Sequence, residues 1–189
     1  MNFSKKHIIL GIICLISALL QSITSVSIFI PYLTFCLCSF VVGVKRKKGI
    51  GIVTILLFGL IALPVFDFIY SNFTASLMTT LFANALILLV QACVYFALFI
   101  LVNSWVNKEK ISFSLITSIL AIFCVVVYSI LEGSQIMAFS NALNQAIEQG
   151  TLVNWLNVMV GKNIFVNILS TAVFYIALWC TSARFIKEK

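Results

Sequence analysis

The chain has 189 residues, of which 62% are hydrophobic and only 9% are charged, and its mean hydropathy is +1.18. A soluble domain carries about 25% charged residues, and a protein of this size leaves much of its surface in water, so the composition excludes a soluble globule. The net charge of +7 comes from short basic clusters between long apolar runs. We read these clusters as a record of membrane topology, with binding of an anionic lipid or nucleotide as the alternative, and we expect an all-helical integral membrane protein with no nucleic-acid partner.

The first apolar run extends from residue 8 to residue 44 without a charge. A single helix over this run would be about 55 Å long, nearly twice the ~30 Å hydrocarbon core of a bilayer. Lys5 and Lys6 precede the run and a basic cluster at 45–48 follows it. Because basic clusters favour the cytoplasm, the run must cross the membrane an even number of times. It is predicted to be a hairpin with spans at about 8–25 and 30–44, and Pro31 interrupts the helix near the turn.

The rest of the chain repeats this plan. We predict spans at about 49–64 and 77–105, with the first of them ended by Pro64, and then spans at about 111–131 and 158–182. The result is a single six-helix membrane domain over residues 1–189 with both termini in the cytoplasm. All lysines and arginines except Lys162 then lie on one side, as the positive-inside rule requires. The Ile-, Asn- and Lys-rich usage suggests a bacterial cytoplasmic membrane.

The outer loop between the fifth and sixth spans has a helical pattern of its own. Ile136, Phe139, Leu143 and Ile147 recur at helical spacing, and polar residues fill the other face. This pattern predicts a short amphipathic helix lying across the outer mouth of the bundle, with Gly133 as a candidate hinge. The helix is either a lid over a pocket or an interfacial helix that rests on lipid.

Polar side chains gather in the outer halves of the fourth and sixth spans. Asn84 and Gln91 share one helical face, and so do Asn163 and Asn167. The inner halves, at 96–102 and 172–180, are nearly all apolar. Amides inside a membrane mark either a binding site or hydrogen-bonded contacts between helices. We expect an outward-opening pocket, and interhelical hydrogen bonding is the alternative.

Charged residues also stand at the outer ends of the spans, namely Asp67, Glu132 and Lys162. Lys162 breaks the positive-inside rule. It either extends to the headgroups or pairs with one of the acids, or it anchors a carboxylate or other anion that enters from outside. The candidate substrate-binding residues are therefore Lys162, Asn163, Asn167, Asn84, Gln91, Glu132 and Asp67.

The motifs of common catalytic sites are missing from the sequence. It has no GxSxG, no HExxH and no glycine-rich phosphate loop. The six cysteines all lie in apolar runs, and His7 is the only histidine. We therefore expect no catalytic residue, no metal and no cofactor, and any active transport must draw its energy from a partner or an ion gradient.

One stretch of the sequence resembles a known family. Its matching residues are Ile30-Pro31-Tyr32-Leu33-Thr34, Gly43, Gly49, Gly51, Leu56-Leu57 and Leu63-Pro64-Val65-Phe66. They resemble the biotin-specific BioY family among the S components of energy-coupling factor (ECF) vitamin transporters. The resemblance implies a small vitamin as ligand, biotin first, and as partners a transmembrane coupling subunit and two ATPase subunits.

The resemblance also implies that small residues on the first helix dock on the coupling subunit. Gly11, Cys14 and Ala18 give a degenerate version of that pattern, and packing inside the protein is the alternative. The cell-shape protein MreD is similar in fold and size. A membrane scaffold of that kind, with no small-molecule ligand, is the second functional hypothesis.

Overall fold

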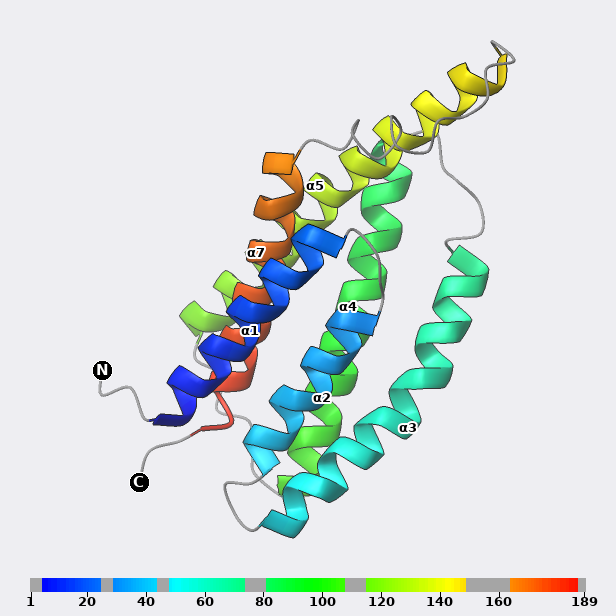
Figure 1. Ribbon diagram of the computed structural model, residues 1–189. Coiled ribbons are helices and arrows are strands. Elements are labelled where there is room, and N and C mark those ends of the chain that lie inside the picture. The colour runs from blue at the N-terminus through cyan, green and yellow to red at the C-terminus, as the bar shows by residue number, and fades with distance from the viewer. Residues whose placement is uncertain are drawn as a thin grey trace.

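The computed structural model describes residues 5–24, 29–43, 48–73, 81–107, 115–148 and 164–186. These residues form helices and no strand, which confirms the all-helical prediction. The helices are α1 (Lys5–Thr24), α2 (Phe29–Gly43), α3 (Lys48–Phe73), α4 (Leu81–Asn107), α5 (Leu115–Glu148) and α7 (Ile164–Ala183). They alternate in direction, so the start of α1 and the end of α7 lie at the same end of the bundle (Figure 1). This end, with Lys5, Lys6 and Arg184, is termed the basic end, and the opposite end is termed the polar end.

The described helices pack side by side in a closed ring. Going round it, α1 contacts α7, α7 contacts α5, α5 contacts α4, α4 contacts α3, α3 contacts α2, and α2 returns to α1. Helix α2 also contacts α4 and α7, so it lies towards the centre. The first and last described helices are locked at the basic end by a hydrogen bond of 3.1 Å from Trp179 Nε1 to the His7 carbonyl oxygen.

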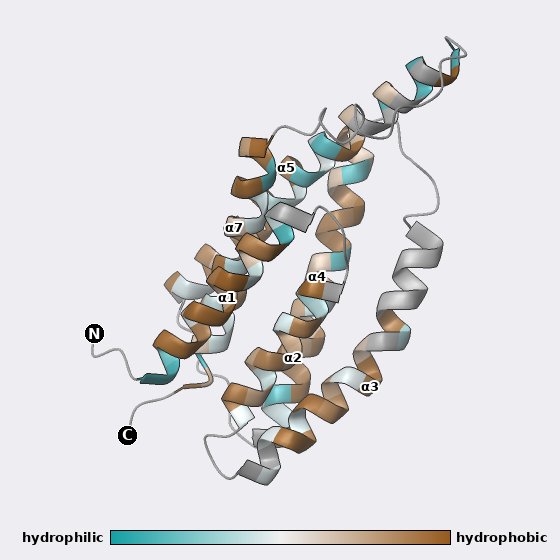
Figure 2. Cartoon of the chain, in the orientation of Figure 1, coloured by the Kyte–Doolittle hydropathy of each residue, from teal (hydrophilic) through white to brown (hydrophobic). Residues whose placement is uncertain are grey.

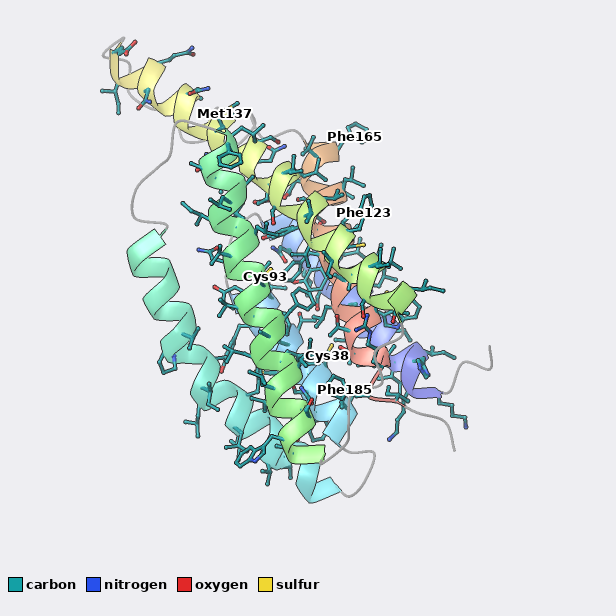
Figure 3. All side chains as sticks on the ribbon, turned by 180° about the vertical axis from the view of Figure 1, so that it is seen from behind. Cys38, Cys93, Phe123, Met137, Phe165 and Phe185 are labelled. Carbon is teal, nitrogen blue, oxygen red and sulfur yellow. The ribbon has the colours of Figure 1, made fainter. Side chains whose placement is uncertain are left out.

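The outer surface of the bundle is apolar, the inverse of a soluble protein. Phe165 is 85% exposed and Phe82 78% exposed, and apolar side chains cover most of the helices' outer faces (Figures 2 and 3). Four described helices, α1, α4, α5 and α7, are long and apolar enough to cross a membrane. The apolar stretches of α2 and α3, Ile30–Gly43 and Gly51–Ala62, are shorter. A surface of this kind is stable only against hydrocarbon, so the structure is that of a multi-pass membrane protein.

Aromatic rings fill the middle of the bundle. Phe35 on α2 is fully buried, and its ring centroid lies 5.3–6.1 Å from those of Phe58, Phe96, Phe99 and Phe174. Most of these pairs meet edge to face or tilted, which is the arrangement that the charge distribution of a π-system favours. The rings therefore join four helices across the middle of the bundle.

Helix α3 does not end at Pro64, contrary to the prediction. The helix continues through the proline to Phe73. Proline removes one backbone hydrogen bond, but membrane helices tolerate this loss and respond by bending. Figure 1 shows a bend in α3, after which its C-terminal part diverges from the bundle. Among the described helices, α3 contacts only α2 and α4.

The separate amphipathic helix predicted after the fifth span is also not observed. Residues 132–148 are helical, but they continue α5 without a break, so α5 is about 51 Å long at 1.5 Å per residue. Its C-terminal turns project beyond the bundle instead of lying across its mouth (Figure 1). Gly133 is not a break in the helix. A Cβ atom there would lie 2.9 Å from the Ala85 backbone nitrogen, so this glycine lets α5 pack directly against α4.

Candidate functional site at the polar end

Polar side chains from four helices meet inside the polar end of the bundle. The helices α4 and α7 contribute three each, α5 contributes two and α1 contributes one. Polar groups in an apolar membrane interior are costly unless they are paired or serve a site. The set is termed the polar cluster and consists of Gln21, Asn84, Gln91, Tyr95, Tyr128, Glu132, Asn167, Ser170 and Tyr175.

Glu132 is the charged member of the polar cluster, and its side chain is half-buried. The Ser170 hydroxyl donates a hydrogen bond of 3.0 Å to Glu132 Oε2. Ser170 also donates to the Asn167 carbonyl oxygen at 3.1 Å, so its hydroxyl is held between the two acceptors. This contact holds one oxygen of the carboxylate against α7, which packs on α5.

Helix α1 is tied to α7 at the same depth. The Tyr175 hydroxyl donates to Gln21 Oε1 at 2.6 Å, and Asn167 Nδ2 donates to the Ser22 carbonyl oxygen at 3.2 Å. Tyr175 lies about two helical turns after Asn167, on the same face of α7. This face of α7 therefore bonds to the end of α1 at two positions. The interhelical hydrogen bonds expected of buried membrane amides are therefore present here.

Tyr128 links the carboxylate to the other tyrosines of the polar cluster. Tyr128 lies one turn before Glu132 on α5 and is close enough to interact electrostatically with Glu132, Tyr175 and Tyr95. Its ring centroid lies 4.8 Å from that of Phe174, which places the tyrosine on top of the aromatic core. The hydroxyl end of the tyrosines therefore belongs to the polar cluster and their rings belong to the core below it.

Helix α4 completes one wall of the polar cluster. Asn84 is 4% exposed, and Gln91 and Tyr95 are half-buried on the same face of the helix. Gly133 brings the neighbouring Ala85 backbone against α5, next to Glu132. Asn84 therefore lies inside the bundle near the depth of the carboxylate, and Gln91 and Tyr95 follow about two and three helical turns further along the same face.

Some predicted site residues cannot be placed. Lys162 and Asn163 lie outside the described residues, and the side chain of Asp67 does as well. The backbone of Asp67 belongs to the C-terminal part of α3, which diverges from the bundle. The roles predicted for these residues, including the anion anchor at Lys162, stay predictions.

The structure adds members that the sequence patterns did not single out. They are Gln21, Tyr128 and Tyr175. Gln135 is a further buried polar residue of α5 near Glu132 in the sequence. Helical spacing would have found Tyr128, four residues before Glu132, and Gln135, three residues after it. Gln21 carries no comparable signal, because only the packing of α1 on α7 brings it to the site.

The interior of the basic end contains more polar side chains than the sequence suggested. Asn103 is fully buried, and its Nδ2 donates to Ser39 Oγ at 3.2 Å and to the Phe99 carbonyl oxygen at 2.8 Å. Thr54, Thr181 and Ser182 are also buried. Of these residues, Asn103 is joined to the aromatic core by its hydrogen bond to the Phe99 carbonyl oxygen.

The small residues of α1 line a groove between α1 and α7. The groove has a volume of 280 Å³ and is lined by Gly11, Cys14 and Ala18 together with Tyr175 and Trp179. Cys14 is buried, and a Cβ at Gly11 would lie 3.6 Å from Trp179 Nε1. The small side chains therefore accommodate packing within the protein, and they also leave a hollow on its surface.

The polar cluster has the chemistry of a binding site for a small polar molecule. A carboxylate only accepts hydrogen bonds, whereas tyrosine hydroxyls and amides both donate and accept. Such a set suits a mostly neutral ligand that carries N–H or O–H donors. Comparison with protein-family models, with curated proteins and with solved structures gives no match.

Proposed function

We propose that the chain is the substrate-binding membrane subunit of an ECF-type uptake transporter and that the polar cluster holds its small-molecule ligand. In this proposal six spans place both termini in the cytoplasm of a bacterium, and the polar end faces outwards. The chain itself carries recognition and is not an enzyme. ATP hydrolysis belongs to two partner ATPases, reached through a transmembrane coupling subunit.

One observation carries the proposal, namely a carboxylate held inside a membrane-type bundle among tyrosines and amides from four helices. An ionisable residue within a membrane segment is costly and marks a functional site by default. Among the described residues, no basic side chain forms an ion pair with Glu132. A ligand that brings N–H donors into the polar cluster would offset the cost of its burial.

Biotin is the first candidate ligand, through the resemblance of residues 30–68 to the BioY family. Its cyclic urea carries N–H groups that can donate hydrogen bonds to a carboxylate. A hydrogen bond to a charged group contributes about 1.5–3 kcal/mol. The carboxylate at the other end of biotin needs a cation, and Lys162 is the residue proposed for that role. The small-residue groove on α1, lined by Gly11 and Ala18, is the proposed contact with the coupling subunit.

The test is a thermal-shift screen of the purified protein against vitamins. A ligand at about 100 times its Kd stabilises the folded state by about 2.7 kcal/mol, so biotin should raise the melting temperature in a concentration-dependent way. The Glu132→Gln variant should bind at least about tenfold more weakly, because it loses a charge-assisted hydrogen bond. Glu148→Gln is the matched control, since Glu148 is exposed at the far end of the same helix.

Absence of a shift with every vitamin would refute the transporter proposal and favour the second one, an MreD-like scaffold. That alternative has support in the hydrogen bonds that the polar cluster makes internally, from Tyr175 to Gln21 and from Ser170 to Glu132. In a scaffold these bonds alone explain the buried polarity. The Glu132→Gln variant would then change stability and leave no ligand affinity to measure.

A further inference from the structure

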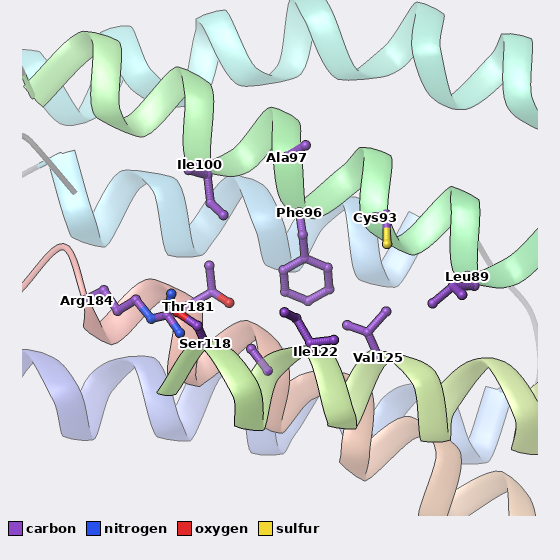
Figure 4. Close-up of a pocket in the computed structure, with 11 residues that line it drawn as sticks. Leu89, Cys93, Phe96, Ala97, Ile100, Ser118, Ile122, Val125, Thr181 and Arg184 are labelled. Atoms are coloured by element: carbon purple, nitrogen blue, oxygen red, sulfur yellow. The ribbon is translucent and has the colours of Figure 1, made fainter. Parts of the chain in front are cut away.

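A second groove lies on the surface between α4 and α5, with the end of α7 at its floor. It has a volume of 280 Å³, and apolar side chains line most of it, among them Leu89, Phe96, Ile122 and Val125 (Figure 4). Cys93 is exposed, so the groove opens on the surface that faces hydrocarbon. None of its lining residues belongs to the polar cluster.

The basic end of this groove differs from the rest. Arg184 lines it there, next to the hydroxyl-bearing side chains of Ser118 and Thr181 (Figure 4). Arg184 is the charged residue of the lining, and partial burial lowers its pKa, with an opposing contribution from Cys180. Arginine nevertheless stays protonated in proteins, so the groove has a positive charge at one end and apolar walls along the rest.

The length of the groove matches one leaflet of a bilayer. Along α4 its lining runs from Ile100, near Arg184, to Leu89, which is about 16 Å at 1.5 Å per residue. Half of the ~30 Å hydrocarbon core is about 15 Å. In a bilayer we therefore expect the charged end at headgroup depth and the apolar end near the middle of the hydrocarbon core.

We propose that the α4–α5 groove binds one anionic phospholipid from the leaflet at the basic end, with the phosphate on Arg184 and an acyl chain along Phe96 and Ile122. Guanidinium and phosphate match in charge, and a guanidinium N–H donates a strong, charge-assisted hydrogen bond to a phosphate oxygen. Ser118 and Thr181 add hydroxyl groups beside the headgroup. The groove between α1 and α7 has the same volume and no charged lining residue, so it lacks this complementarity.

Native mass spectrometry of the detergent-purified protein tests the proposal, with phosphatidylglycerol and phosphatidylcholine of identical acyl chains as probes. Wild type should retain one phosphatidylglycerol in preference to phosphatidylcholine. The Arg184→Gln variant should lose about fivefold in phosphatidylglycerol affinity, as expected for one basic residue at an anionic surface, and should lose the preference. Lys5→Gln is the charge control, because Lys5 is exposed at the same end but outside the groove.

A second pair of variants tests the position of the acyl chain. Ala97→Trp fills the α4–α5 groove and should abolish the retained lipid, whereas Ala18→Trp fills the α1–α7 groove and should not. Equal retention in wild type, Arg184→Gln and Ala97→Trp would overturn the proposal. Preferred binding of free oleate over phosphatidylglycerol would overturn the choice of a phospholipid. Neither result depends on vitamin binding, so this proposal fails or stands separately from the transporter proposal.

Discussion

Replacing Gly133 with alanine separates two explanations of this glycine. If Gly133 were a hinge, alanine would stabilise the helix by about 1 kcal/mol, because alanine has the higher helix propensity. In the structure the added Cβ would lie 2.9 Å from the Ala85 nitrogen and 3.2 Å from its Cα. Carbon contacts are optimal at about 3.5–4.0 Å, so α4 and α5 must separate by several tenths of an ångström. The obstacle is backbone, which cannot rotate away.

Overpacking of this kind costs about 1–3 kcal/mol, and the propensity gain offsets about 1 kcal/mol of it. We therefore expect Gly133→Ala to lower the free energy of unfolding by up to about 2 kcal/mol, measured by SDS titration in mixed micelles with tryptophan fluorescence. Gly49→Ala is the control, because nothing lies within 4 Å of a Cβ at Gly49, and it should not destabilise. A Gly133→Ala variant that is more stable than wild type would refute the close-packing explanation.

Further predictions concern the core, the polar cluster and the topology. Phe35→Ala should lower the free energy of unfolding by about 3–5 kcal/mol in the same titration, because it removes a fully buried ring, whereas the 78% exposed Phe82→Ala should change it by less than about 0.5 kcal/mol. An equal effect of both variants would contradict the aromatic core. Tyr175→Phe should destabilise by about 0.6 kcal/mol through loss of its interhelical hydrogen bond, and a stabilised variant would show that the bond is not formed. In a cysteine-free background, Lys162→Cys should react with an impermeant maleimide on intact cells and Lys5→Cys only after lysis; the reverse pattern would invert the proposed orientation.

Periodicity and composition predicted the helices because they depend on local chemistry. Long apolar runs form helices in a membrane, since every backbone group must be satisfied within the segment. The helical face shared by Asn84 and Gln91 was also predictable, because helical geometry alone fixes it. Helix ends were harder to predict. A proline such as Pro64 ends a helix in water far more often than in a membrane. The polar residues after Leu131 are compatible with a loop as well as with the exposed end of α5.

The sequence by itself determined that this chain is a bundle of apolar helices with amides and a carboxylate on their interior faces. Only the tertiary structure decided which of those groups meet. Gln21 and Tyr175 are far apart in the sequence, and they pair because α1 packs against α7 in the ring. The sequence around Gly133 was compatible with a hinge, whereas the structure shows that Gly133 allows α5 to pack closely against α4. Contacts between helices depend on the simultaneous packing of all side chains, and no local pattern along one helix contains that information.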